Sequence, residues 1–122
     1  MARNGIFQSV TLPLPPSANR YWRSLGRGHV TLSAEAKDYR EQAGWAARTE
    51  GVEPYSGDVS IQLDFYFPNK RGDLDNRIKQ AIDSMRGHAY DDDKQIMKIV
   101  AVRHTDKDNP RLDFTVYREL TL

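Results

Sequence analysis

The stretch DVSIQLDFYF, residues 58–67, is the clearest structural signal in the sequence. From Val59 to Phe67 every second residue is apolar, and the residues between them are polar or, at Tyr66, amphipathic. Side chains of a β-strand alternate between the two faces of a sheet, so this pattern predicts a strand with one buried face. Pro68 follows directly and ends the strand, because proline cannot donate a hydrogen bond to a neighbouring strand.

One helical segment is expected before this strand in the sequence and another after it. The first begins after Ser33, a residue type that caps helix N-termini, and ends at Gly51. The second runs from about residue 75 to about residue 86, where apolar residues recur at helical spacing, and ends at Gly87.

Three further strands complete the prediction. They are FQSVTLPL (7–14), IMKIVAVRH (96–104) and RLDFTVYREL (111–120). The last two are joined by TDKDNP, which is rich in turn residues and short enough for a hairpin. The order β-α-β-α-β-β predicts one α+β domain over residues 1–122, with a mixed sheet and two helices packed on it.

The composition limits the class of protein. The 122 residues are 39% hydrophobic and 29% charged, which is ordinary for a globular domain. There is no cysteine, so disulfides and thiolate metal sites are excluded. No apolar run approaches the roughly 20 residues that span a bilayer, and no signal-peptide pattern opens the chain, so a cytoplasmic protein without membrane contact is expected. The net charge is only +1, but the first 34 residues contain no acid.

The segment KRGDLDNRIK, residues 70–79, places two aspartates inside a basic collar at a strand-to-helix junction. Asp73 and Asp75 share a face only in extended backbone, so they converge only if Asp73 precedes the helix. Helix capping is the simpler interpretation, although it explains one carboxylate and not both. Lys79 lies four residues after Asp75, a spacing suited to an ion pair on one helix face or to a functional lysine.

A second acidic cluster, YDDDKQ (90–95), precedes the next strand. A solvated loop is the simpler interpretation of Asp91, Asp92 and Asp93 taken alone. However, loop and helix junctions can meet at one end of a sheet, and convergent aspartates there suit Mg²⁺ or Mn²⁺. Basic neighbours at such a site favour a phosphate-bearing substrate, with Lys79 stabilising developing negative charge.

The segment PPSANRYWR, within an expected loop over residues 15–32, combines arginines with aromatic rings. Arginines contact phosphates and aromatic rings stack on unpaired bases, so the segment suits nucleic acid. The alternative is that Tyr21 and Trp22 are core residues and the arginines are surface charges. No phosphate-binding or dinucleotide-binding glycine motif is present, so no nucleotide cofactor is expected.

Together these segments resemble the RusA family of Holliday junction resolvases of bacteria and their phages. The resemblance rests on LPLPPSANRYWR, SAEAKDYR, KRGDLDNRIKQAIDSM and DDKQI, which follow one another in that order. It implies a homodimer that binds four-way DNA junctions and makes paired, symmetric nicks with a divalent metal, in DNA recombination and repair. By motif, Asp73 and Asp75 resemble the family's metal-binding aspartates, Lys79 its catalytic lysine, and Asp93, with its neighbour Asp92, its third acid.

The sequence therefore predicts an Mg²⁺-dependent endodeoxyribonuclease, with Mn²⁺ able to substitute. Its predicted catalytic residues are Asp73, Asp75, Asp93 and Lys79, with Asp92 as a further candidate metal ligand. The predicted DNA-binding residues are Asn19, Arg20, Arg23, Lys70 and Arg71. Two alternatives are a non-catalytic module that binds DNA junctions and a metal-dependent phosphoesterase of small substrates.

Overall fold

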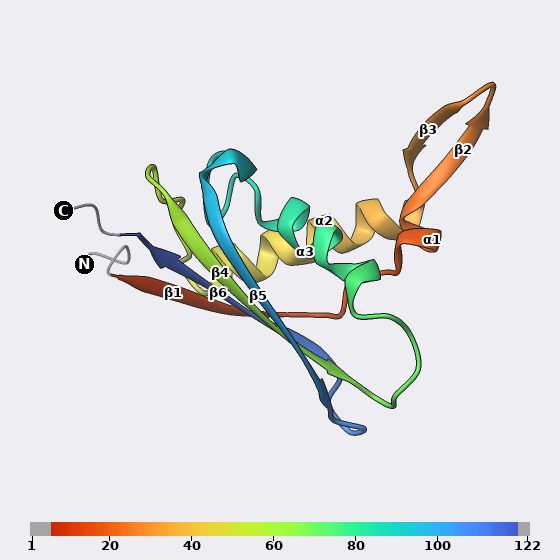
Figure 1. The fold of residues 1–122 in the computed structure, drawn as a ribbon. Coiled ribbons are helices and arrows are strands. Elements are labelled where there is room, and N and C mark those ends of the chain that lie inside the picture. The colour runs from red at the N-terminus through yellow and green to blue at the C-terminus, as the bar shows by residue number, and fades with distance from the viewer. Residues whose placement is uncertain (1–5, 120–122) are drawn as a thin grey trace.

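The strand predicted from DVSIQLDFYF lies inside the sheet of the protein, seen here in a computed structural model that describes residues 6–119 (Figure 1). This strand, β4 (Val59–Phe67), is buried at every second position from Val59 to Phe67. It pairs with β6 (Arg111–Arg118) on one side and with β5 (Ile96–Thr105) on the other. With β1 (Phe7–Leu12) the sheet has the order β1-β6-β4-β5.

The sheet is mixed, as predicted, but its last two strands do not form the hairpin expected from TDKDNP. β4 lies between them, parallel to β5 and antiparallel to β6. The crossover from β4 through a helix to β5 occupies one edge of β4, so β6 pairs at the other edge. The short connection crosses the end of β4, where the Asp106 N–H donates to the Phe67 carbonyl at 2.7 Å.

Two helices cover one face of the sheet, as Figure 1 shows: α2 (Ala34–Thr49) and α3 (Ile78–Met85). The cap predicted for α2 is confirmed, because the Ser33 hydroxyl accepts from the Ala36 N–H at 3.1 Å. Gly51 ends it at a backbone φ of 73°, where a residue with a Cβ is strained. The core lies between these helices and the sheet, and includes Phe65, Met85 and Phe114. The α+β class and the order of the main elements are thus confirmed.

The segment expected to be a loop contains a short helix and a hairpin instead. Helix α1 (Ala18–Tyr21) is followed by β2 (Trp22–Gly26) and β3 (His29–Leu32), which pair with each other and project away from the sheet (Figure 1). Tyr21 is buried and belongs to the core, whereas the Trp22 side chain is 48% exposed. The core alternative is therefore confirmed for Tyr21 and is wrong for Trp22.

Two short 3₁₀ helices complete the described elements: η1 (Asp75–Arg77) leads into α3, and η2 (Asp93–Gln95) leads into β5. Leu120, the predicted end of the last strand, lies outside the described residues. Within residues 6–119, no helix is long and apolar enough to cross a membrane.

Candidate active site

The paired aspartates lie between β4 and α3, and helix capping does not account for them. Asp73 precedes η1 and Asp75 begins it, which meets the condition that Asp73 lie outside the helix. The N-cap positions of η1 and α3 are Leu74 and Arg77, and neither makes a side-chain cap bond. Asp73 Oδ2 accepts from the Asn76 side chain at 3.4 Å. Both carboxylates are exposed, and within residues 6–119 neither forms an ion pair.

Lys79 connects α3 to the second acidic cluster. Its Nζ lies 2.8 Å from Asp83 Oδ1 and 3.8 Å from Asp93 Oδ2. The hydrogen bond to Asp83 raises the pKa of the lysine, so it stays protonated at neutral pH. The pair with Asp75 that the spacing allowed does not form. Residues 75–77 are 3₁₀, and Arg77 with φ −122° departs from helical geometry before α3 begins.

Asp83 is a site residue that the sequence reasoning missed. Its side chain is 21% exposed, and it provides the closest anionic partner of Lys79. The signal was present, because a lysine and an aspartate four residues apart in a predicted helix lie on one face. We expect Asp83 to hold the ammonium group in position beside Asp93.

The three consecutive aspartates of YDDDKQ have different roles. Asp92 Oδ1 accepts from the Lys94 N–H at 3.0 Å and so caps η2, while its Oδ2 lies 3.6 Å from Arg86. The backbone hydrogen bond to Lys94, aided by Asp93 and the nearby cations, holds the pKa of Asp92 below its usual value. Asp93, in contrast, lies beside Lys79. The geometry therefore favours Asp93 over Asp92 as the carboxylate available to a ligand.

Gln95 fixes the backbone of this acidic segment. Its side-chain oxygen accepts from the N–H groups of Asp91 and Asp92, both at 2.8 Å. Its amide nitrogen donates to the carbonyls of Tyr55 and Gly57, both at 2.7 Å. One side chain thus ties the acidic segment to the turn before β4, which explains a glutamine at this position in physical terms.

The acidic side chains have the oxygen donors that suit a hard divalent cation, but within residues 6–119 they do not form a preorganised set of metal ligands. Carboxylate oxygens are the donors that Mg²⁺ and Mn²⁺ prefer. Among the described residues, no cation pairs with Asp73 or Asp75. Within residues 6–119, however, no three His, Cys, Asp or Glu side chains lie close enough together to hold a metal ion. A bound ion would have to draw these exposed carboxylates together.

Arg103 of β5 holds the basic collar against the sheet. Its guanidinium donates to the carbonyls of Gly72 at 2.7 Å, Arg71 at 2.8 Å and Asn69 at 3.2 Å, and it lies 4.2 Å from the centre of the Phe67 ring. The loop that carries Lys70 and Arg71 up to Asp73 is therefore fixed by a residue that sequence reasoning did not identify.

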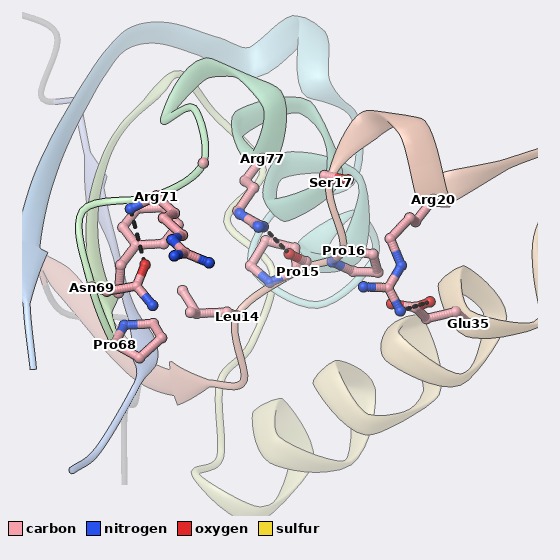
Figure 2. Close-up of a pocket in the computed structure, with 12 residues that line it drawn as sticks. Leu14, Pro15, Pro16, Ser17, Arg20, Glu35, Pro68, Asn69, Arg71 and Arg77 are labelled. Carbon is pink, nitrogen blue, oxygen red and sulfur yellow. Dashed lines mark hydrogen bonds and ion pairs between the residues drawn. The ribbon is translucent and has the colours of Figure 1, made fainter. Parts of the chain in front are cut away.

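The predicted DNA-binding residues do not all lie together. Arg20 of α1 and Arg71 line one open pocket, whereas Arg23 lies on the projecting hairpin (Figures 1 and 2). Asn19 and Lys70 are exposed. We call the pocket lined by Arg20, Arg71 and Arg77 the arginine pocket.

Arg77 is a third residue, after Asp83 and Arg103, that the sequence reasoning missed. It donates to the Pro15 carbonyl at 3.1 Å, a contact between residues far apart in the chain that no local pattern predicts. Burial, with the nearby cations Arg103 and Arg20, lowers the pKa of its guanidinium from the ordinary value. Positive charge is thus concentrated at this end of the molecule.

Comparison with known proteins adds the following similarities. A family model described as Endodeoxyribonuclease RusA matches residues 13–117, a range that contains every site residue named above. The Crossover junction endodeoxyribonuclease RusA of Escherichia coli (strain K12) is 32% identical over 111 residues, which is 88% of this chain and 92% of that protein. The protein of the same name from Enterobacteria phage 82 is 31% identical over 110 residues, covering 88% and 91%.

Proposed function

The chain belongs to the RusA endodeoxyribonuclease family, and from this premise we propose that it cleaves four-way DNA junctions by hydrolysis of phosphodiester bonds. The relatives are named crossover junction endodeoxyribonucleases. The observation that carries the proposal is the contact between Lys79 and Asp93 at 3.8 Å. It joins the motif that runs from Asp73 into the first turn of α3 to the motif that follows this helix.

The chemistry follows from the residues around Lys79. Asp73, Asp75 and Asp93 would hold Mg²⁺ or Mn²⁺, which when bound polarises a phosphoryl oxygen and activates water. Lys79, kept protonated by Asp83, would stabilise negative charge on the phosphate or on the leaving oxygen. Asp92, whose Oδ1 caps η2, would add a ligand through Oδ2, which lies 3.6 Å from Arg86.

The projecting hairpin supports DNA as the substrate. Arg23, Arg27 and His29 lie on β2, its turn and β3, and residues 18–33 contain no acid. Trp22 and Leu25 are exposed on the same hairpin, at 48% and 60%. A two-stranded ribbon fits a DNA groove, and apolar side chains beside arginines can contact unstacked bases. We therefore propose that the hairpin contacts the junction, together with Asn19 and Lys70.

We also propose a homodimer, because two symmetric cuts require two active sites related by a two-fold axis. The β5 edge supports this proposal. It is an edge strand of the sheet, and Met97, Ile99, Val100 and Val102 are 57%, 45%, 37% and 36% exposed on it. An open edge strand with exposed apolar residues is a surface that proteins usually cover.

A second candidate function is a junction-binding module without catalysis. It is favoured by one observation, that no three metal-binding side chains lie together within residues 6–119. One assay separates the candidates: the protein is incubated with a labelled four-way junction, a linear duplex and a small phosphodiester, with and without Mg²⁺. The resolvase proposal predicts paired nicks in the junction only when Mg²⁺ is present. Tight binding without cleavage in either Mg²⁺ or Mn²⁺ would show the binding module instead.

A further inference from the structure

The arginine pocket is an open cavity of about 370 Å³ with a surplus of positive charge. In Figure 2, Arg71 and Arg20 stand at opposite ends of the pocket and Arg77 lies between them. Glu35 is the one carboxylate among the described lining residues, and Arg20 holds it at 2.9 Å. Arg71 and Arg77 are left without an anionic partner in the described part of the chain.

Within residues 6–119, the Arg77 side chain has a donor in this pocket that makes no hydrogen bond. Its Nη1 donates to the Pro15 carbonyl, and its guanidinium lies 5.2 Å from the centre of the Phe67 ring. Its Nε is buried and has no partner within residues 6–119. Because Nε is enclosed, a ligand in the open pocket reaches Arg77 through Nη2, which makes no hydrogen bond within residues 6–119. A guanidinium N–H donates a strong, charge-assisted hydrogen bond to a phosphate oxygen.

The Nη2 atom of Arg77 lies near the loop that leads to the paired aspartates. A Cβ placed on Gly72 would lie 3.7 Å from Arg77 Nη2, and Gly72 directly precedes Asp73. Arg103 fixes the same loop through three carbonyls, so the distance from the pocket to Asp73 is set by the fold. An anion held by Arg77 would therefore sit at a constant distance from the proposed site of cleavage.

We propose that the arginine pocket binds a phosphodiester group of the DNA strand, flanking the one that is cleaved, and so sets the register of the strand on Asp73 and Asp75. This inference rests on the proposed function, because it takes the same DNA as ligand. Arg77 and Arg71 supply the donors, and Ser17, which also lines the pocket, supplies a hydroxyl. A phosphodiester of DNA and free inorganic phosphate both present phosphate oxygens to these donors, and the experiment below distinguishes between the two ligands.

The test measures binding of a labelled four-way junction without divalent metal, over a range of salt concentrations. Each phosphate contact contributes about one to the slope of log K against log salt. Arg71→Met and Arg77→Met should each lower that slope by about one and weaken binding about five- to tenfold. The matched control is Arg48→Met, because Arg48 is exposed on α2 outside the pocket. Unchanged slopes in both pocket variants would overturn the proposal.

Circular dichroism checks that each variant is folded, and the two pocket variants differ in how far they can disturb the fold. Arg77 bonds to Pro15, so its replacement can disturb the fold, whereas the Arg71 side chain has no hydrogen bond or ion pair within residues 6–119. If Arg77→Met does not fold, the salt dependence of junction binding by Arg71→Met alone tests the proposal. The Arg77 Nε–H resonance gives a direct readout in the parent. It should shift on adding junction DNA, and a shift with inorganic phosphate but not with DNA would overturn the DNA assignment.

The outcome is separable from that of the proposed function. Binding is measured without metal, so a protein that fails to cleave still reports on the pocket. In Mg²⁺, the pocket variants should spread the nicks over neighbouring phosphates. Nicks that stay at one position with unchanged KM in both variants would reject the pocket while leaving the resolvase proposal intact.

Discussion

Gln95 offers a sharp test of how the acidic segment is held. Its side chain makes four hydrogen bonds: two from the Asp91 and Asp92 N–H groups and two to the Tyr55 and Gly57 carbonyls. Those to Asp91 and Gly57 are exposed, so water can replace them at little loss, whereas those to Asp92 and Tyr55 are partly buried. Each buried bond contributes about 1 to 1.5 kcal/mol.

Gln95→Met should therefore lower the free energy of unfolding by about 2 to 3 kcal/mol. For a domain of this size that corresponds to a fall in Tm of about 10 °C. Urea denaturation followed by circular dichroism measures the change. Because the variant also frees the backbone beside Asp93, junction cleavage should fall even at temperatures where the protein is folded.

Gln95→Glu is the informative companion variant. It keeps an acceptor for the Asp91 and Asp92 N–H groups but points a carboxylate oxygen at two carbonyls, which raises the pKa of the new side chain. Its stability deficit should shrink as the pH falls and the glutamate is protonated, because only the protonated form can donate. A free energy of unfolding for Gln95→Met within about 0.5 kcal/mol of that of the parent, the range of an ordinary surface substitution, would show that these hydrogen bonds do not hold the segment.

Three other predictions follow from single contacts. Asp83→Asn should lower the raised pKa of Lys79 toward its ordinary value. In the parent, the ion pair stabilises the fold at pH values below the ordinary pKa of lysine, and this stabilisation is lost as the pH rises through the raised pKa. The variant should therefore lose less stability in alkali than the parent, as urea denaturation at several pH values would show. Arg103→Met should speed amide exchange or proteolysis in the loop over residues 69–72, and equal rates in variant and parent would contradict this role. Tyr90→Phe should destabilise the protein by about 1 to 2 kcal/mol, measured in urea, because the buried hydroxyl donates to the Ile82 carbonyl at 2.7 Å near the end of α3; no loss would show that water replaces it.

The sequence predicted those elements whose signals are local. Alternation identified β4, and Ser33 with Gly51 bounded α2, because one buried face and two caps leave their pattern in consecutive residues. The β2–β3 hairpin was missed because every residue of β2 is exposed, so no alternation marks it. The order of β5 and β6 depends on which edge of β4 each strand occupies, which turn composition does not encode.

The candidate site divides in the same way. The apolar periodicity predicted a helix from about residue 75 and so placed Asp73 ahead of it, and the family resemblance singled out Asp93 among three aspartates. The partners that hold these segments come from distant parts of the chain, as Arg103 does for the collar and Gln95 for the acidic segment. Arg77 also meets its partner, Pro15, far from its own position in the chain. Only the three-dimensional packing reveals these contacts.

We propose that Asp73 and Asp75, the acidic pair ahead of α3, take part in phosphodiester hydrolysis on branched DNA. The most direct test compares the parent with Asp73→Asn and Asp75→Asn, each shown to be folded, on a labelled four-way junction in Mg²⁺. Since both carboxylates are exposed and free of ion pairs within residues 6–119, neither change should destabilise the fold. We predict that junction binding is retained and that nicking falls by at least about a hundredfold, the scale on which loss of a catalytic electrostatic group acts. Nicking at the rate of the parent by either folded variant would contradict the claim.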